Sequence, residues 1–343
     1  MSKIRICFLG TPDFAAACLT SLLQDEHYEV VGVVTQPDRP SGRKMLLTPS
    51  PVKMVAQAQG LKVLSPESLK DQSWALAEIQ SWRAEVAVVV AFGQILTENF
   101  LQLFNFGVVN VHASLLPRWR GAAPIQRSIE AGDTHTGVCL QKVVKKLDAG
   151  DVLGLRSMAI SADTDSLQLH DQMIPSAVDL LKVELMDYVR GNLVPTPQDE
   201  SKVTYAKKLD KRESELDWNL SAEALDRKIR AFVWGPGTYS YFRGKKIKIH
   251  RTEVDSLLAS SALGTKLNGD SLFAGAPPAV NAEVDETSVS LGTIVSMTNE
   301  WLLVKTNNNL LKIFEVQPES RNRMPVSDFV KGYGVQVGDV FGK

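Results

Sequence analysis

The chain has only three cysteines in 343 residues, and Cys7, Cys18 and Cys139 lie far apart in the sequence. An odd number without a Cys-x-x-Cys pair argues against a disulfide framework and against a zinc ribbon. Proteins of reducing compartments show this usage, so we expect a cytoplasmic location.

Long apolar runs are also absent, because no stretch approaches the roughly 20 apolar residues that a membrane-spanning helix needs. Near the start of the chain, Lys3 and Arg5 interrupt what would have to be the apolar core of an export signal. We therefore expect no membrane span and no export signal.

An excess of charge of one sign is missing too, since the formal net charge is −1. The charge is unevenly distributed, however: residues 202–251 hold 13 Lys and Arg against 6 Asp and Glu, and Arg243–Arg251 contains no acidic residue. This basic segment is compatible with a nucleic-acid surface. Lysines also protect exposed sheet edges, so a structural interpretation has about equal weight.

Three common site motifs do not occur. The chain lacks the Gly-x-Gly-x-x-Gly of dinucleotide-binding folds, the Gly-x-x-x-x-Gly-Lys phosphate loop and the Gly-x-Ser-x-Gly nucleophile turn. A bound NAD, a phosphate-loop nucleotide site and a serine nucleophile therefore have no support in the sequence.

The first half of the chain alternates short β-branched runs with helical stretches, which is typical of a mostly parallel sheet covered by helices. We predict a Rossmann-like α/β domain over residues 1–190. Its expected strands are 4–9, 30–35, 86–91, 107–112, 137–143 and 152–160, and its expected helices are 14–24, 51–59, 73–82, 122–131 and 166–189.

Residues 191–209 contain two prolines and polar residues, so we interpret them as a linker. From 210 to 343 short apolar runs with turn residues between them predict a small β-barrel domain of the oligonucleotide-binding (OB-like) type. The expected strands are 238–242, 246–249, 292–295, 301–305 and 310–313, and residues 259–290 are expected to form an extended loop.

Asn110 and His112 end an apolar run, and Asp148 follows further along the chain. Residues two apart on a strand share a face, so Asn110 and His112 would enter one pocket at the carboxyl end of a parallel strand, where such sheets bind ligands. A lone histidine is more often structural than catalytic. Together, however, an amide donor, an imidazole and a carboxylate can fill three complementary catalytic roles.

This set suits acyl transfer without a covalent intermediate, in which an amine attacks a carbonyl carbon and donors stabilise the oxyanion. A metal site is the competing interpretation. Asparagine is a poor ligand for transition metals, and paired histidines at metal-binding spacing are missing, so we expect no metal.

Four segments resemble the methionyl-tRNA formyltransferase family of folate-dependent enzymes: Gly10–Phe14, Asn110–Pro117, Arg118–Ile125 and Leu147–Asp151. The resemblance implies transfer of a formyl group from 10-formyltetrahydrofolate to the amino group of initiator methionyl-tRNA. It implies that Asn110, His112 and Asp148 are catalytic. The residues that it places around the folate are Phe92, Gly93, Ile95, Leu96, Ser114, Leu115, Leu116 and Pro117.

The loop after the second strand is longer than most connections and carries basic residues, so it is a candidate for tRNA binding. In the resembling family this loop enters the acceptor stem. Its alternative interpretation is an inert surface excursion. The candidate tRNA-binding residues in the loop, at the linker exit and on the basic segment are Arg39, Arg43, Lys44, Lys207, Lys245, Lys246 and Lys248.

Two rival functions remain open. A formyltransferase acting on a small amine would use the same three catalytic residues, but it would need neither the basic loop nor the basic domain. A non-catalytic RNA-binding module would keep the fold alone. We expect the chain to act as a monomer.

Overall fold

The computed structural model describes residues 2–41, 45–70, 72–255 and 289–342. The chain forms two compact units. The first contains residues 1–125, 134–161 and 168–207, and the second contains residues 126–133, 162–167 and 208–343. Arg43, Lys44 and most of the expected loop at 259–290 lie outside the described residues.

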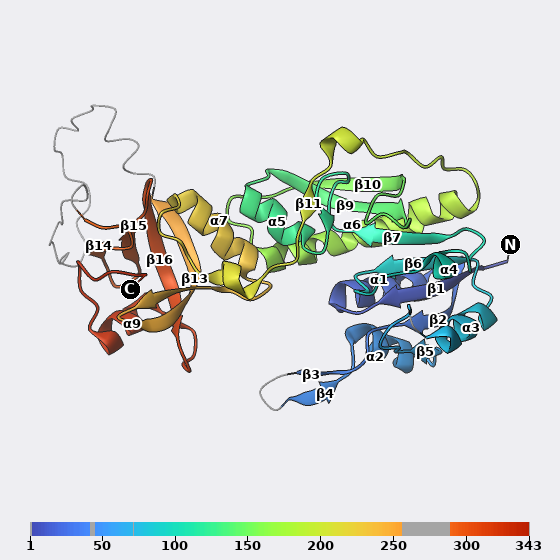
Figure 1. The fold of residues 1–343 in the computed structure, drawn as a ribbon, viewed down its shortest axis with the longest axis horizontal. Helices are drawn as coiled ribbons and strands as arrows, with labels where there is room; N and C mark the ends of the chain where they lie inside the picture. Colours follow the sequence, from blue (N-terminus) through green and yellow to red (C-terminus); the bar gives the residue numbers. More distant parts are fainter. Residues whose placement is uncertain (1, 42–44, 71, 256–288, 343) are drawn as a thin grey trace. The chain divides into compact units, whose positions relative to one another are not determined.

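A seven-stranded sheet forms the centre of the first unit, in the order β10-β9-β7-β6-β1-β2-β5 (Figure 1). The neighbouring strands from β7 to β5 are all parallel. The β7–β9 and β9–β10 pairs are antiparallel. The strands are β1 (Ile4–Gly10), β2 (Tyr28–Val34), β5 (Val63–Leu64), β6 (Val86–Val90), β7 (Val108–His112), β9 (His135–Lys142) and β10 (Val152–Ala159).

Helices cover both faces of this sheet, because the side chains of β1 from Ile6 to Leu9 are fully buried whichever face they point to. Cys7 and Leu9 pack in one cluster with helix residues Ile79 and Phe100. The helices with members in the first unit are α1 (Asp13–Gln24), α2 (Pro51–Ala58), α3 (Ser73–Ser81), α4 (Glu98–Leu101), α5 (Pro124–Ala131) and α6 (Ser166–Val189).

The long loop after β2 contains a hairpin of β3 (Arg39–Ser41) and β4 (Leu46–Thr48) that projects away from the sheet (Figure 1). Its described apolar residues are exposed: Met45 is 67%, Leu46 65% and Leu47 71% accessible. The hairpin therefore adds nothing to the core of the unit.

The second unit is built on an antiparallel sheet in the order β12-β13-β16-β15-β14, with β17 added beside β16. Bridges from Phe341 to Phe242 and from Val340 to Thr293 place the end of the chain against both sheet edges, as a closed barrel requires. The strands are β12 (Thr238–Phe242), β13 (Lys245–Asp255), β14 (Ile294–Met297), β15 (Leu302–Lys305), β16 (Leu310–Pro318) and β17 (Met324–Pro325).

Two helices of this unit, α7 (Ala222–Phe232) and α9 (Val326–Tyr333), were not anticipated from the sequence. Ser221 caps α7 by accepting a hydrogen bond from the backbone N–H of Ala224, and the buried face of the helix includes Leu225 and Ile229. Both helices contribute to the barrel core, so the unit is more than a bare barrel.

The predicted α/β domain followed by an antiparallel β domain is confirmed. Each predicted strand and helix overlaps an observed one, but β13 ends six residues (255 − 249) and β16 five residues (318 − 313) beyond the predicted end. Across the described ranges, no helix is both long and apolar enough to cross a membrane.

Candidate functional site

His112 is the last residue of β7, and its ring lies where Asp148 and the loop after the strand meet. It is only 6% exposed. The Nδ1 atom lies 3.8 Å from Oδ2 of Asp148, and Nε2 lies 2.9 Å from the carbonyl oxygen of Trp119. The histidine and carboxylate that are 36 positions apart in sequence (148 − 112) therefore face each other in one pocket.

These contacts fix the role of each ring nitrogen. A carbonyl oxygen only accepts hydrogen bonds, so Nε2 of His112 carries a proton and donates to Trp119. The 3.8 Å separation from Asp148 is too long for a hydrogen bond, so Nδ1 makes none with that carboxylate.

Asp148 is held by donors on both carboxylate oxygens. The backbone N–H of Gly121 donates to Oδ2 at 2.8 Å, and the side-chain amide of Gln141 donates to Oδ1 at 3.1 Å. The Asp148 backbone is left-handed, with φ of 46°, a conformation that costs most residues energy but suits Asp and Asn better. The turn is therefore held in place by its contacts.

Gly150 shows why this turn needs a glycine. A Cβ at this position would lie 1.8 Å from the backbone oxygen of Lys142, which cannot move aside as a side chain can. The turn closes against the end of β9, where the N–H of Lys142 donates to the carbonyl of Asp151 at 2.9 Å. The Asp-Ala-Gly sequence thus returns the chain tightly to the sheet.

Asn110 lies two residues before His112 on the same face of β7, and in the neighbouring β9 it is paired with Gln141. It is half-buried, and among the described residues its side chain has no hydrogen-bond partner. Its amide therefore remains available as a donor beside the imidazole.

The candidate folate residues form two loops at the carboxyl ends of β6 and β7, which are adjacent parallel strands. In the loop after β7, Ser114 is buried and donates to the carbonyl of Arg118 at 2.6 Å, and the bond before Pro117 is cis. In the loop after β6, Ile95 is 79% exposed, whereas Phe92 and Leu96 pack into the core cluster beneath.

The candidate tRNA residues are scattered over two surfaces. Arg39, on the hairpin of the first unit, pairs with Glu67 at 3.0 Å. On β13 of the second unit, Lys246 and Lys248 stand on the outer face opposite Tyr241 and Tyr239 of β12. Nζ of Lys246 lies 3.5 Å from the centre of the Tyr239 ring. Lys245 is exposed, and Lys207 ends the first unit.

Sequence reasoning missed three residues of this site: Arg120, Gln141 and Gln198. Gln141 had a detectable signal, because it is a polar residue, 1% exposed, in the buried strand next to Asn110. Arg120 is fully buried and donates through Nε and Nη2 to the side-chain oxygen of Gln198. No local pattern links these two residues, which are 78 positions apart.

None of the cysteines has the properties of a nucleophile. Cys7, Cys18 and Cys139 are buried and unpaired. Burial raises the pKa of Cys18 and of Cys139 to about 12, and it also raises the pKa of Cys7. The thiolate form is therefore negligible near neutral pH.

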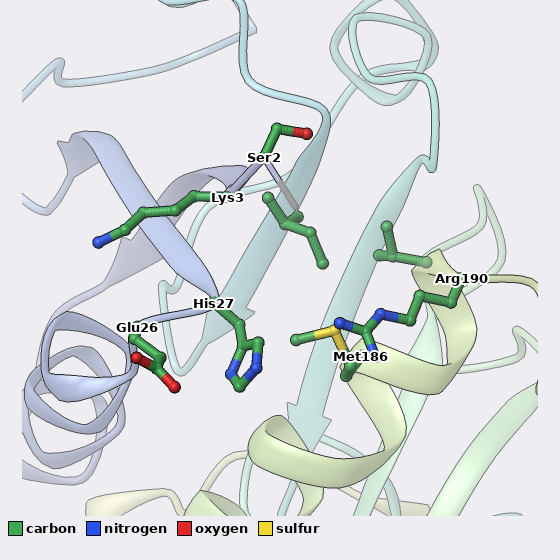
Figure 2. Close-up of a pocket in the computed structure, with 8 residues that line it drawn as sticks. Ser2, Lys3, Glu26, His27, Met186 and Arg190 are labelled. Carbon is green, nitrogen blue, oxygen red and sulfur yellow. The ribbon is translucent and has the colours of Figure 1, made fainter.

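A cavity of about 680 Å³ lies elsewhere in the first unit, lined by residues at the start of β1 and the end of α6 (Figure 2). His27 and Arg190 border it together with the apolar Met186. Because β1 and β7 belong to the parallel part of the sheet, the start of β1 lies at the opposite edge from His112. The cavity is therefore separate from the Asn110, His112 and Asp148 set.

Two family profiles match the chain. The formyl transferase family matches residues 3–181, and the formyl transferase C-terminal domain family matches residues 208–334. A solved sugar 3N-formyltransferase, WlaRD, in the presence of dTDP and 5-N-formyltetrahydrofolate, has the same fold, with a TM-score of 0.61 and 14% identity. The match covers 94% of this chain and 100% of that one.

Two curated relatives are much closer in sequence, and both are methionyl-tRNA formyltransferases. The protein from Bdellovibrio bacteriovorus is 58% identical over 342 residues, covering 100% of both chains. The protein from Caldicellulosiruptor saccharolyticus is 37% identical over 335 residues, covering 98% of this chain and 99% of the relative. The chain therefore belongs to the methionyl-tRNA formyltransferase family.

Proposed function

We propose that Asn110, His112 and Asp148 carry out the formyl transfer of this family by direct attack of the amine on the formyl carbon. The chain is an enzyme that moves a formyl group from 10-formyltetrahydrofolate to methionyl-tRNA. The observation that carries the catalytic assignment is the approach of His112 Nδ1 to Asp148 Oδ2 at 3.8 Å, in a pocket shared with a free amide.

In the proposed mechanism, the methionyl amine attacks the formyl carbon of the donor and a tetrahedral oxyanion forms. The amide of Asn110 and the Nδ1–H of charged His112 donate hydrogen bonds to that oxygen. Asp148 stabilises the imidazolium and relays the amine proton to N10 of the folate as the bond from N10 to the formyl carbon breaks. The products are formylmethionyl-tRNA and tetrahydrofolate.

A protein nucleophile is not needed for this chemistry. The buried cysteines, whose pKa values are raised, support direct attack over a covalent formyl-enzyme intermediate. Among the described residues, no group of His, Cys, Asp and Glu is arranged to hold a metal ion, so the proposal assigns the polarisation of the carbonyl to hydrogen-bond donors.

For the folate we propose the loops after β6 and β7. Ile95 offers an exposed apolar side chain to the pterin, whereas the buried Phe92 and Leu96 support the loop from below. Gly93, with φ of 82°, permits the turn, and Ser114, Leu115, Leu116 and Pro117 form the other wall. We expect Ile95→Asp to raise the KM for the folate donor.

For the tRNA we propose that residues 1–190 act as the catalytic domain, 191–209 as the linker and 210–343 as the tRNA-binding domain. Lysines and tyrosines on the outer face of β12 and β13 can pair with phosphates and stack on bases. The remaining candidates are Arg39, Arg43 and Lys44 on the loop, Lys207 at the linker exit and Lys245 next to the outer face.

A small amine as the acceptor is the nearest alternative. The sugar formyltransferase with the same fold matches 94% of this chain, so a second domain alone does not separate the two functions. The identity of 58% over the full length with a methionyl-tRNA formyltransferase favours tRNA.

An assay with purified protein tests the proposal. Formylation by 10-formyltetrahydrofolate is followed with charged initiator tRNA and with glycinamide ribonucleotide or an amino sugar nucleotide as acceptor. We expect activity with the tRNA, and its loss in His112→Ala. His135→Ala is the matched control, because His135 is an exposed histidine on β9. Activity that survives His112→Ala would overturn the catalytic assignment.

We also propose that the enzyme works as a monomer in the cytoplasm, where its charged tRNA substrate is found. Sedimentation of the full chain checks the first point, since a stable dimer at micromolar concentration would contradict it.

A further inference from the structure

The segment from Thr196 to Ala206, here called the strap, crosses the catalytic loops of the first unit. Thr196 pairs with Val152 directly after the Asp148 turn, through two backbone hydrogen bonds of 2.8 Å. Further along, β11 (Tyr205–Ala206) pairs in parallel with β8 (Arg120–Gly121). A segment that the sequence suggests is a linker is therefore paired with the backbone on both sides of the site.

Gln198 of the strap sits between these two pairings and is bonded on both sides of its amide. Its oxygen accepts from Arg120 Nε at 3.0 Å and Nη2 at 2.8 Å. Its nitrogen donates to the carbonyls of Asp148 at 2.9 Å and Gly150 at 2.7 Å. Arginine only donates and carbonyls only accept, so this orientation of the amide is the one that satisfies every partner.

The same amide nitrogen lies 3.3 Å from the side-chain oxygen of Gln141, whose own nitrogen donates to Oδ1 of Asp148. Gln198 thus contacts the backbone of the turn and also the residue that orients the Asp148 carboxylate. Because Asp148 has a left-handed backbone, its position depends on such contacts.

We propose that Gln198 is a positioning residue for the formyl transfer, whose amide clamps the Asp148–Gly150 turn so that the Asp148 carboxylate faces His112. This inference rests on the proposed function, because it assumes that Asp148 acts on His112. The clamp is anchored from behind by Arg120, which also pairs with Glu200 of the strap at 2.8 Å.

Arg120 makes the clamp rigid. It is fully buried, and its backbone N–H donates to the carbonyl of Thr204 at 2.9 Å. The neighbouring Trp119, whose carbonyl accepts from His112, donates its own N–H to the hydroxyl of Thr204 at 2.9 Å. The strap therefore fixes the partners of both His112 and Asp148.

Gln198→Glu tests the donor of the amide separately from its acceptor. A carboxylate keeps an acceptor for Arg120, but it loses the donor and places a second oxygen against the carbonyls of Asp148 and Gly150. We expect kcat to fall about tenfold or more, with KM for tRNA and for folate changed less than about twofold.

Gln80→Glu is the matched control, because it makes the same substitution at an exposed glutamine of α3, away from the strap and the turn. Its kcat should stay close to that of the wild type. Wild-type kcat in folded Gln198→Glu would overturn the clamp.

If Gln198→Glu does not fold, Gln198→Asn takes its place, because it keeps both functional groups on a side chain that is too short to reach the carbonyls. Wild-type kcat in folded Gln198→Asn would also overturn the clamp. The failure of the proposed function looks different: Asp148→Asn and His112→Ala would then be active, whatever the Gln198 variants do.

Discussion

The pocket of His112 and Asp148 and the outer face of β12 and β13 use polar side chains in opposite ways. In the pocket, Asp148 is bonded through both carboxylate oxygens and through its own carbonyl. On the outer face, Lys248 is exposed, and Nζ of Lys246 lies over an aromatic ring. Hydrogen bonds hold the polar atoms of the pocket in place, whereas the outer face presents positive charge to the solvent.

The difference fits what each region is proposed to recognise. Transition-state stabilisation depends on donors placed within a few tenths of an ångström, and misplacement by about 1 Å can cost a hundredfold in rate. Attraction to phosphates acts over a Debye length of about 8–10 Å and tolerates moving side chains. Changes in the pocket should therefore alter kcat, and changes on the outer face should alter tRNA binding.

The largest effect is expected for Asp148→Asn, which removes the negative charge that faces His112. The two groups that donate to the Asp148 carboxylate would then find one oxygen and one nitrogen, and the nitrogen cannot accept a hydrogen bond. We expect kcat to fall by about 10²- to 10³-fold, because charge stabilisation and the proton relay are both lost. Steady-state formylation kinetics measure the loss, and a thermal melt checks the fold. Near-normal kcat would remove Asp148 from the mechanism.

Gly150→Ala tests whether the backbone of the turn matters apart from the carboxylate. Its methyl group would lie 1.8 Å from the oxygen of Lys142, so the turn must shift and carry Asp148 with it. We expect a stability loss of about 1–3 kcal/mol, as for other overpacked sites, and a drop in kcat of about tenfold or more.

Gly332→Ala is the control for Gly150→Ala, because a Cβ at Gly332 meets nothing within 4 Å. Urea unfolding and formylation kinetics on both variants separate the clash from the general effect of an alanine. Equal behaviour of the two variants would show that the turn tolerates displacement.

Much of this organisation could be predicted because it is local. The alternation of apolar runs and helical stretches predicts the sheet, and the end of the apolar run at Asn110 and His112 predicts that they lie at the end of a strand. Periodicity cannot predict which distant segment closes over a site. Gln198 contacts residues that are 48 and 50 positions away along the chain, and no local pattern indicates such contacts. The sequence therefore suggests only a linker where the strap lies.

The helices of the second unit illustrate a different limit. In α7 the charged residues are frequent, and its apolar face consists of a few residues such as Leu225 and Ile229. The neighbouring segments have β-type patterns, so these few apolar residues do not by themselves indicate a helix, although Ser221 offers an N-cap signal. The helix forms because the barrel core covers its apolar face, which is a tertiary effect.

Lys248→Ala should sharpen the contrast from the side of the tRNA. Loss of one phosphate contact should raise the KM for tRNA a few-fold, leave kcat and the KM for folate unchanged, and reduce the slope of log affinity against log salt by about 1. Lys331→Ala removes the same charge from an exposed position on α9 and is the control. If the two variants respond equally to salt, net charge and not the outer face attracts the RNA.

The smallest effect concerns the anchor of the strap. Hydrogen bonds from Arg120 and then from Lys146 lower the pKa of Glu200 from the ordinary 4.5 to about 2. A carboxyl group whose pKa is lower in the folded state stabilises the fold above its unfolded pKa, and this contribution is lost as the pH falls from about 4.5 to about 2.

Glu200→Gln should therefore be slightly less stable than the wild type at pH 7, and the difference should shrink towards pH 2. Urea unfolding of both proteins at several pH values measures it, and a difference that grows in acid would show that Glu200 is not held as an anion by Arg120. The effect should be small because the Glu200 side chain is 59% exposed, so water competes with both partners. Glu200 can therefore hold the buried Arg120 behind the clamp while it contributes little to the stability of the fold.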